Sequence, residues 1–486
     1  MMYALDSEPF QLELDAIHTL QKQGQLLLAD ESTLQLLEDT PDLSPEQREA
    51  LRFELERTRR IRLDYSLTED ELKSSLQKKL PEGVYSDDAF EEWKQEGYFD
   101  FKLIDSETLR YFRPSVPNFF FRHDTIKPAD FKPGLTKWES FLLAEAERVI
   151  AEVESSPTRT AQPRDFEIWF RATMKPELIL NEGSTLRAWI PFPQEFAFQT
   201  HVDLLETLPV VEQISPNGST HRSLYFEETI TSTHAPREFY ARWSMTRYPQ
   251  YTNIDPARVP LVQNTQGMES FLSEQLPHVV FTPELLALEQ EISRGLTNPA
   301  EKARAYYEWI SHNIKYSYAH EYSTVHNISD FVRSNSYGDC GQIALLFITL
   351  CRAGGVPARF SAGWVIYPMY TGMHDWAEIY LEPYGWVHVD ANWGIFIERD
   401  FDGLSREKRD LLKNYYFGGI DAYRLTISRD HGKPHVPAKT DFRSDTVDFQ
   451  RGEYEVDGRN IYFPEFGYSL SVQYHDGHTK HSGAFD

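Results

Sequence analysis

The sequence predicts a multidomain protein of the α+β class, in which helical and β-rich segments follow one another along the chain. The chain has 486 residues, which is enough for about three domains of roughly 150 residues. Hydrophobic residues make up 41% of it and charged residues 26%, as is typical of a globular protein. In some segments apolar residues recur every three to four positions, as in a helix, and in others every second position, as in a strand. Helical and strand regions are therefore expected to be separate.

Residues 1–160 are predicted to be a helical N-terminal region. Ser44 and Gln47 form a capping box around a proline that is well placed to begin a helix. Thr136 and Glu139 repeat the capping pattern ahead of an apolar repeat with helical spacing. Each of these signals marks the start of an amphipathic helix.

Residues 161–255 are predicted to form an immunoglobulin-like β-sandwich. From Phe239 to Thr246 apolar and polar residues alternate, as they do in a strand with one buried face. Turns rich in Pro, Asn and Gly separate this strand from others of the same kind. Three such strands are expected, at 166–173, 185–191 and 222–230.

Residues 256–400 are predicted to form a third domain, in which helices precede strands, and residues 401–486 a β-rich C-terminal extension. Thr282 and Asn298 each precede a proline and an apolar repeat, which marks a helix start. The extension is expected to hold one short helix and two strands, at 406–414, around 454 and at 469–473.

Charge and hydropathy limit the partners and the compartment. The formal net charge of −26 argues against binding to nucleic acid, because phosphates need Lys and Arg patches. No run of 18 apolar residues occurs, so no membrane-spanning segment is predicted. The first ten residues lack a signal-peptide pattern. The protein is therefore expected to be cytoplasmic if Met1 is its native start, and periplasmic or surface-located if a leader has been removed.

The two cysteines predict a reactive thiol rather than a disulfide framework. Cys340 follows Asp339, a suitable N-cap, and so begins a predicted helix. This position favours a thiolate, and the free N–H groups of the first turn can bind an oxyanion. Cys351 lies eleven residues along the same helix, about 16 Å away, which excludes a disulfide between the two. Its apolar neighbours indicate a structural thiol.

A base and a carboxylate for Cys340 are found on two strands predicted after its helix. His374 lies near the start of the first strand and Asp390 at the end of the second. With Cys340 they are the residue types of a thiol–imidazole–carboxylate triad. The predicted turn, however, places Asp390 opposite Glu378, about 13 Å from the position across from His374. A bulge or a strong twist is then needed to bring His374 and Asp390 together.

The motifs around these residues resemble the transglutaminase-like superfamily of papain-like fold, in particular its bacterial multidomain members. The stretches GDC, CRAGGVPAR, HDWAEIYL and GWVHVDANWG occur in the family's order between residues 301 and 394. The resemblance implies that residues 256–400 are an α+β catalytic core, with Cys340 as nucleophile, His374 as base and Asp390 as the orienting carboxylate. The one departure is Ala391-Asn392, where many members have Pro-Thr after the aspartate.

The resemblance implies a thiol enzyme that acts on amide bonds of a peptide or protein through a thioester acyl-enzyme. Hydrolysis, as by a cysteine peptidase or amidase, is preferred because many bacterial members look like that. Two alternatives stay open. Acyl transfer to an amine uses the same intermediate, and a non-catalytic module would bind a protein or a glycan.

Further side chains are candidates for the oxyanion site or the substrate pocket, each with a structural alternative. They are Gln342, Trp309, Tyr316, Trp376 and Glu378. The alternatives are a surface position for the glutamine, core packing for the aromatic residues and a structural hydrogen bond for the glutamate. Asp375 is less suited than Asp390 to orient His374, because neighbours in a strand point to opposite faces.

No metal site and no cofactor are predicted. The chain has no HExxH motif, and its two cysteines are too few for a multi-cysteine zinc site. No EF-hand-type calcium loop occurs. Histidines 312, 320 and 326 are close in sequence but lack the helical spacing of two metal ligands with a carboxylate, so they are expected in loops.

Overall fold

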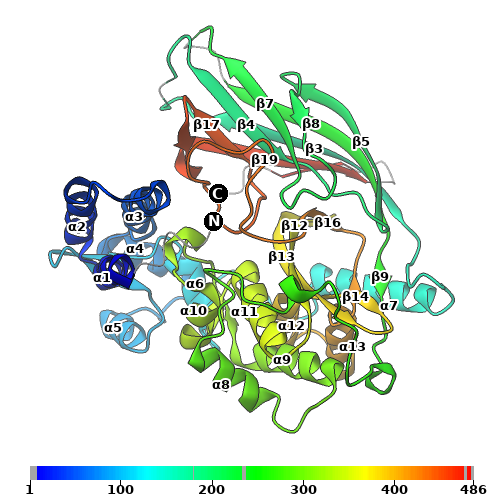
Figure 1. Cartoon of the computed structure of the whole chain (residues 1–486). Coiled ribbons are helices and arrows are strands. Elements are labelled where there is room, and N and C mark those ends of the chain that lie inside the picture. The colour runs from blue at the N-terminus through cyan, green and yellow to red at the C-terminus, as the bar shows by residue number, and fades with distance from the viewer. Residues whose placement is uncertain (1–7, 179, 233–236, 475–478, 483–486) are drawn as a thin grey trace. The chain divides into compact units, whose positions relative to one another are not determined.

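The computed structural model describes residues 8–178, 180–232, 237–474 and 479–482. Its contacts divide the chain into two units. One unit comprises the chain up to residue 132 together with 315–326, and the other comprises the remainder. Both helices and antiparallel sheets are present, which confirms the α+β class (Figure 1).

The first unit is built from helices and one small hairpin. At α3 the Ser44 side chain accepts a hydrogen bond from the Gln47 amide, and the Gln47 side chain accepts one from the Ser44 amide. The hairpin β1–β2 was not predicted; its turn contains Asp105 and Ser106, both with positive φ, instead of a recognisable Asn-Gly pair. The elements are α1 (Glu8–Gln23), α2 (Leu26–Asp39), α3 (Pro45–Asp64), α4 (Glu69–Lys79), α5 (Asp87–Gln95), β1 (Phe101–Ile104), β2 (Thr108–Tyr111), α6 (Ser115–Arg122) and β10 (Lys315–Tyr316).

Two five-stranded antiparallel sheets form one part of the second unit. Their strand orders are β18-β17-β4-β7-β6 and β20-β19-β3-β8-β5. Inward-facing residues of both sheets, such as Phe170, Trp243, Trp189 and Phe226, belong to one hydrophobic core. The strands are β3 (Arg164–Met174), β4 (Thr185–Pro191), β5 (Gln199–Leu208), β6 (Gln213–Ile214), β7 (Ser223–Thr229), β8 (Glu238–Arg247), β17 (Glu453–Val456), β18 (Arg459–Ile461), β19 (Phe466–Tyr474) and β20 (Thr479–Ser482).

The C-terminal strands complete these sheets rather than forming an extension of their own. Strand β19 pairs with β3 along its whole length, and β17 pairs with β4 (Figure 1). Helix α7 (Lys137–Val153), predicted as part of the N-terminal region, also lies in the second unit, where Trp138 packs edge-on against Tyr367. The boundaries of the two units therefore differ from those of the four predicted segments, both near the N-terminus and near the C-terminus.

A four-stranded antiparallel sheet with the order β14-β13-β12-β16 forms the other part of the second unit. Helix α11 packs on β12 and β13 (Figure 1). Residues 341–352 of this helix are all buried. The elements are α8 (Pro283–Ile292), α9 (Pro299–Asn313), α10 (Ile328–Asn335), α11 (Cys340–Ala353), β12 (Ala358–Tyr367), β13 (Tyr370–Leu381), β14 (Gly385–Val389), α12 (Ala391–Arg399), α13 (Arg406–Tyr416) and β16 (Arg424–Ser428).

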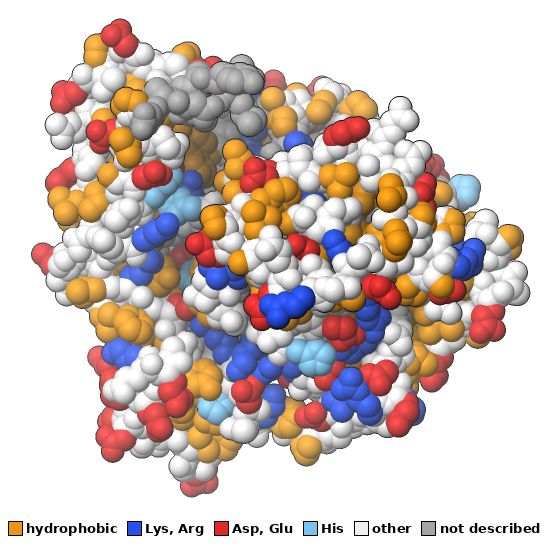
Figure 2. Space-filling view, turned by 60° about the horizontal axis from the view of Figure 1, so that its bottom comes forward, with side chains coloured by type: hydrophobic (Ala, Val, Ile, Leu, Met, Phe, Trp, Pro, Cys, Tyr) orange, Lys and Arg blue, Asp and Glu red, His pale blue; other side chains and the backbone are white. Residues whose placement is uncertain are grey.

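The described surface carries charges of both signs. On the face shown in Figure 2, Lys and Arg side chains lie among Asp and Glu side chains and hydrophobic ones. Ion pairs such as Arg242–Glu167 and Arg406–Glu398 link many of these groups. None of the helices in the described ranges is long and apolar enough to cross a membrane.

A buried histidine, His435, predicts a loss of stability in acid. Its ring packs against Phe449 with centroids 4.4 Å apart, and burial lowers its pKa well below the usual value. The unfolded chain then binds more protons below about pH 6.5, so the histidine's contribution to stability falls as the pH drops. We expect His435→Phe to lose less stability in acid than the wild type does. The difference between their unfolding free energies should grow in favour of the variant by about 1.4 kcal/mol for each pH unit below 6.5. Urea titrations between pH 5 and 8 measure this, and parallel curves would contradict it.

Candidate active site

Cys340 is the first residue of helix α11, and its thiol forms a hydrogen bond with a neighbouring carboxyl group. The Asp339 side chain caps the helix by accepting a hydrogen bond from the Gln342 amide at 3.0 Å. The Cys340 thiol donates a hydrogen bond to Asp375 Oδ2 at 3.4 Å. The predicted helix start is thus present, and the sulfur lies beside strand β13.

The electrostatic surroundings of Cys340 do not favour a thiolate, in contrast to the prediction from its helix position. Burial raises the pKa of the Cys340 thiol well above its usual value, and the carboxylates of Asp375 and Asp339 raise it further. Burial likewise raises the pKa of Cys351, which lies fully inside the core as a structural thiol should.

His374 and Asp390 are in direct contact. His374 Nε2 lies 2.6 Å from Asp390 Oδ2, and both side chains are buried. The predicted register was wrong by two residues: Leu381 pairs with Gly385, so that His388, not Asp390, lies opposite Glu378. Asp390 comes directly after the end of β14, two residues beyond His388. In this register it lies near His374 without a bulge between β13 and β14.

Asp390 is held as a carboxylate by its contacts with Arg424 and His374. Burial opposes its ionisation, but the interactions with His374 and Arg424 prevail and lower the pKa of Asp390 to about 2. Arg424 Nη1 pairs with Asp390 Oδ2, and the guanidinium lies over the rings of Trp376, Trp393 and Tyr416. Burial lowers the pKa of His374, although Asp390 acts in the opposite direction. His374 is therefore neutral near pH 7 and able to accept a proton.

The structure does not join the three predicted residues in one chain of hydrogen bonds: Asp375 is the partner of Cys340, and the other two residues pair with each other. Asp375 and His374 are consecutive residues of β13, so the two pairs lie on adjacent positions of one strand. Within the described residues no hydrogen bond joins Cys340 to His374.

Two of the further candidates lie in this neighbourhood with structural partners. Trp376 stacks on His374 at a centroid distance of 6.1 Å and donates its indole N–H to His388 at 3.2 Å. Glu378 pairs with Arg359 at 2.6 Å and accepts a hydrogen bond from Ser361. Its carboxylate is thus occupied, as the structural alternative for this residue predicted.

The other three candidates differ in their surroundings. Gln342 is fully buried, not on the surface, and its side-chain amide has no hydrogen-bond partner in the described part of the chain. Trp309 is half-buried on α9 and lines a hollow of about 450 Å³ together with Asn313. Tyr316 belongs to the first unit, where it packs edge-on against Phe121.

Gln450, which sequence reasoning missed, connects the C-terminal part of the chain to this site. Its amide Nε2 lies within hydrogen-bond distance of Asp375 Oδ1 at 2.8 Å and of the backbone carbonyl oxygens of Gly363 and His374. Trp364 donates its indole N–H to the Gln450 carbonyl. The residue follows Cys340 by 110 positions in a segment without regular structure, so no local pattern marks it.

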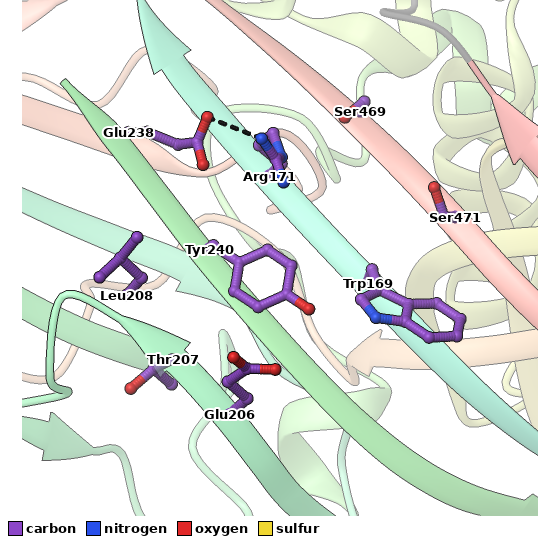
Figure 3. A pocket seen from close by; sticks show the side chains of 9 residues that line it. All are labelled: Trp169, Arg171, Glu206, Thr207, Leu208, Glu238, Tyr240, Ser469 and Ser471. Atoms are coloured by element: carbon purple, nitrogen blue, oxygen red, sulfur yellow. Dashed lines mark hydrogen bonds and ion pairs between the residues drawn. The ribbon is translucent and has the colours of Figure 1, made fainter. Parts of the chain in front are cut away.

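Two other observations concern binding sites elsewhere. A pocket of about 550 Å³ lies on the outer face of the β19-β3-β8-β5 part of its sheet, where Trp169, Tyr240 and the Arg171–Glu238 ion pair line it (Figure 3). It contains none of the predicted site residues. No group of three or more His, Cys, Asp or Glu side chains within the described residues is placed to hold a metal ion. His312 lies on helix α9, not in a loop as predicted.

Comparison with known proteins points to one family. Residues 286–391 match the model of the transglutaminase-like superfamily. The curated proteins include no match. A solved structure described as a candidate cysteine protease from Cytophaga hutchinsonii is 15% identical, with 67% of this chain and 92% of that chain covered and a TM-score of 0.41. The periplasmic domain of TgpA from Pseudomonas aeruginosa is 18% identical, with 52% and 94% covered and a TM-score of 0.26.

At these TM-scores the assignment rests on the family match alone. The matched residues include α9, α11, β12, β13 and β14, and they end one residue after Asp390. The chain therefore contains a transglutaminase-like core at residues 286–391, and this core carries Cys340, His374 and Asp390.

Proposed function

We propose that the protein is a thiol enzyme that hydrolyses amide bonds of a peptide or protein, with Cys340 as nucleophile, His374 as base and Asp390 as the orienting carboxylate. The observation that carries this proposal is the buried 2.6 Å contact between His374 Nε2 and Asp390 Oδ2. Because Nε2 bears the hydrogen of that bond, Nδ1 is the nitrogen left to accept a proton. A base needs this tautomer to activate a thiol.

The reaction follows in two halves from these roles. The Cys340 thiol transfers its proton to His374 Nδ1, and the sulfur attacks the carbonyl carbon of the amide. His374 returns the proton to the leaving amine, which leaves a thioester on Cys340. Water then gives a proton to His374 and attacks the thioester, which releases the acid and the free thiol. Backbone N–H groups at the start of α11 are available to the oxyanion of both tetrahedral intermediates.

The acyl-enzyme supplies the test. We expect the purified full chain, mixed with a library of peptide amides and quenched within milliseconds to seconds, to carry an acyl group on the peptide that contains Cys340. Mass spectrometry of the digested protein locates the group. Cys351→Ser should keep it, whereas Cys340→Ser should lose the thioester.

The fate of the thioester separates the two reactions that share it. Adding an amine at millimolar concentration diverts the acyl group from water in a transferase, and the ratio of amide to acid in the product measures this. A product that stays acid supports hydrolysis. An acyl group on neither cysteine, with any substrate tested, would favour the non-catalytic binding module.

A further inference from the structure

Gln450 holds the carboxyl group that binds the Cys340 thiol. Its amide donates to Asp375 Oδ1 at 2.8 Å, and Asp375 Oδ2 accepts the hydrogen bond of the thiol at 3.4 Å. The same amide nitrogen lies 3.1 Å from the carbonyl oxygen of His374 and 3.0 Å from that of Gly363. These contacts tie Gln450 to both β12 and β13 at the position of the candidate base.

The contacts are enclosed by protein. Gln450 and Asp375 are 4% and 2% exposed, and the Gln450 backbone carbonyl, separately from the side-chain amide, accepts a hydrogen bond from the Trp364 indole at 3.0 Å. A buried amide with these partners is costly to displace, because each lost hydrogen bond leaves an unpaired group in a place that water does not reach. The orientation of the Asp375 carboxyl therefore depends on Gln450.

The charged groups that face this pair come from three parts of the chain. Asp339 precedes α11, Asp375 lies on β13, and the others lie between β16 and β17. Apart from Cys340 and Asp375 themselves, these groups are Asp339, Asp445, Asp448 and Arg451. Burial raises the pKa of Asp375 well above its usual value, and the carboxylates of Asp339 and Asp445 add to this effect.

We propose that Gln450 is a positioning residue that keeps Asp375 bonded to the Cys340 thiol, and that this contact is a resting state from which the thiol must pass to His374. The proposal rests on the proposed function, because only a thiol enzyme needs the second state. Asp375 accepts a hydrogen bond through the same thiol hydrogen that His374 has to take as a proton, so the two contacts exclude each other. Gln450 thus sets how often the thiol is released, and it does so from a segment far along the chain from the matched core.

Iodoacetamide labelling of the full chain between pH 5 and 11 tests the proposal, with the Cys351 peptide as an internal reference. The reagent reacts with the thiolate, so the pH at half-maximal labelling follows the thiol's ionisation. Asp375→Asn keeps the side-chain shape and carries no charge. We expect it to lower the midpoint for Cys340 by at least one pH unit, which raises labelling at pH 7 about tenfold or more.

Removing the anchor should act in the same direction. Gln450→Met keeps the length of the side chain but has no N–H, so Asp375 is no longer held against the thiol. We expect its midpoint to fall as well. Gln450→Asn, whose amide is one methylene short of Asp375, serves if the first variant does not fold. Gln199→Ala is the matched control, because Gln199 is equally buried and donates to the backbone carbonyls of Gln194 and Thr426.

The outcomes separate this proposal from the proposed function. An unchanged midpoint in Asp375→Asn, or in whichever Gln450 variant folds, overturns the positioning role. An equal shift in Gln199→Ala overturns it too, since general loosening would then explain the result. His374→Ala in the Asp375→Asn background addresses the base instead: labelling near pH 7 that does not fall removes His374 from the mechanism and leaves the positioning result intact.

Discussion

Asp390→Asn should lower kcat about 10³- to 10⁴-fold, with little change in KM. In the wild type, Asp390 Oδ1 accepts a hydrogen bond from the Trp393 amide and Oδ2 accepts one from His374. An asparagine that keeps the Trp393 contact turns its NH₂ group toward His374 Nε2. That nitrogen must then be the acceptor, so the hydrogen moves to Nδ1 and the ring can no longer take the thiol proton.

Steady-state kinetics on any substrate that forms the acyl-enzyme measure the effect. Glu289→Gln is a suitable control, because Glu289 is a buried carboxylate of the same unit that accepts a hydrogen bond from Tyr306 at 2.6 Å. Its kcat should stay within about threefold of the wild type. If Asp390→Asn also stayed within tenfold, Asp390 would not be the group that sets the tautomer.

Arg424→Met should lower the unfolding free energy by about 3–5 kcal/mol. The Arg424 side chain is 1% exposed and pairs with Asp390 and, at 3.5 Å, with Asp421. Burial alone disfavours the charged form of both carboxyl groups, and Arg424 is a positive neighbour that they share. Removing it leaves two buried carboxylates with one fewer cation, and this penalty is larger than the loss of the hydrogen bonds themselves.

A double-mutant cycle shows whether that explanation holds. Adding Asp390→Asn to Arg424→Met removes one of the two unpaired buried charges. The loss of unfolding free energy in the double variant should therefore be smaller, by at least about 1.5 kcal/mol, than the sum of the losses in the two single variants. Urea unfolding at pH 7 provides the three values. Strictly additive losses would mean that Arg424 does not stabilise the fold through its pairing with Asp390.

The features that were predictable from sequence are those encoded within a few residues. The Asp339 cap and the start of α11 follow from local chemistry, and both are present as predicted. The pairing of His374 with Asp390 was harder, because a three-residue turn can close on different residues. The pair that closes the turn is Leu381 with Gly385. The predicted pair lay one residue further along each strand, so the residue predicted to lie opposite Glu378 was wrong by two positions.

The features that were missed depend on residues distant in sequence. Arg424 and Gln450 reach the site from beyond the matched core, and neither lies in a pattern that indicates its partner. The raised pKa of the Cys340 thiol was missed for a different reason: a helix start by itself predicts a low thiol pKa, and the sequence does not show that the thiol is buried beside Asp375. Alternation also identified β17 and β19 as strands without showing which sheet each one joins.

The pairing of β19 with β3 has a consequence for the chain while it is being made on the ribosome. Leu470, which pairs with Phe170, is synthesised about 300 residues after it, and Tyr454 is likewise synthesised long after its partner Ala188. At 5–20 residues per second this interval lasts about 15 to 60 seconds. Throughout it, β3 and β4 each lack the neighbour on one side and offer an open hydrogen-bonding edge to other nascent chains. A premature stop between the core and β17 makes that exposure permanent, so such shortened products should aggregate even though their transglutaminase-like core is complete.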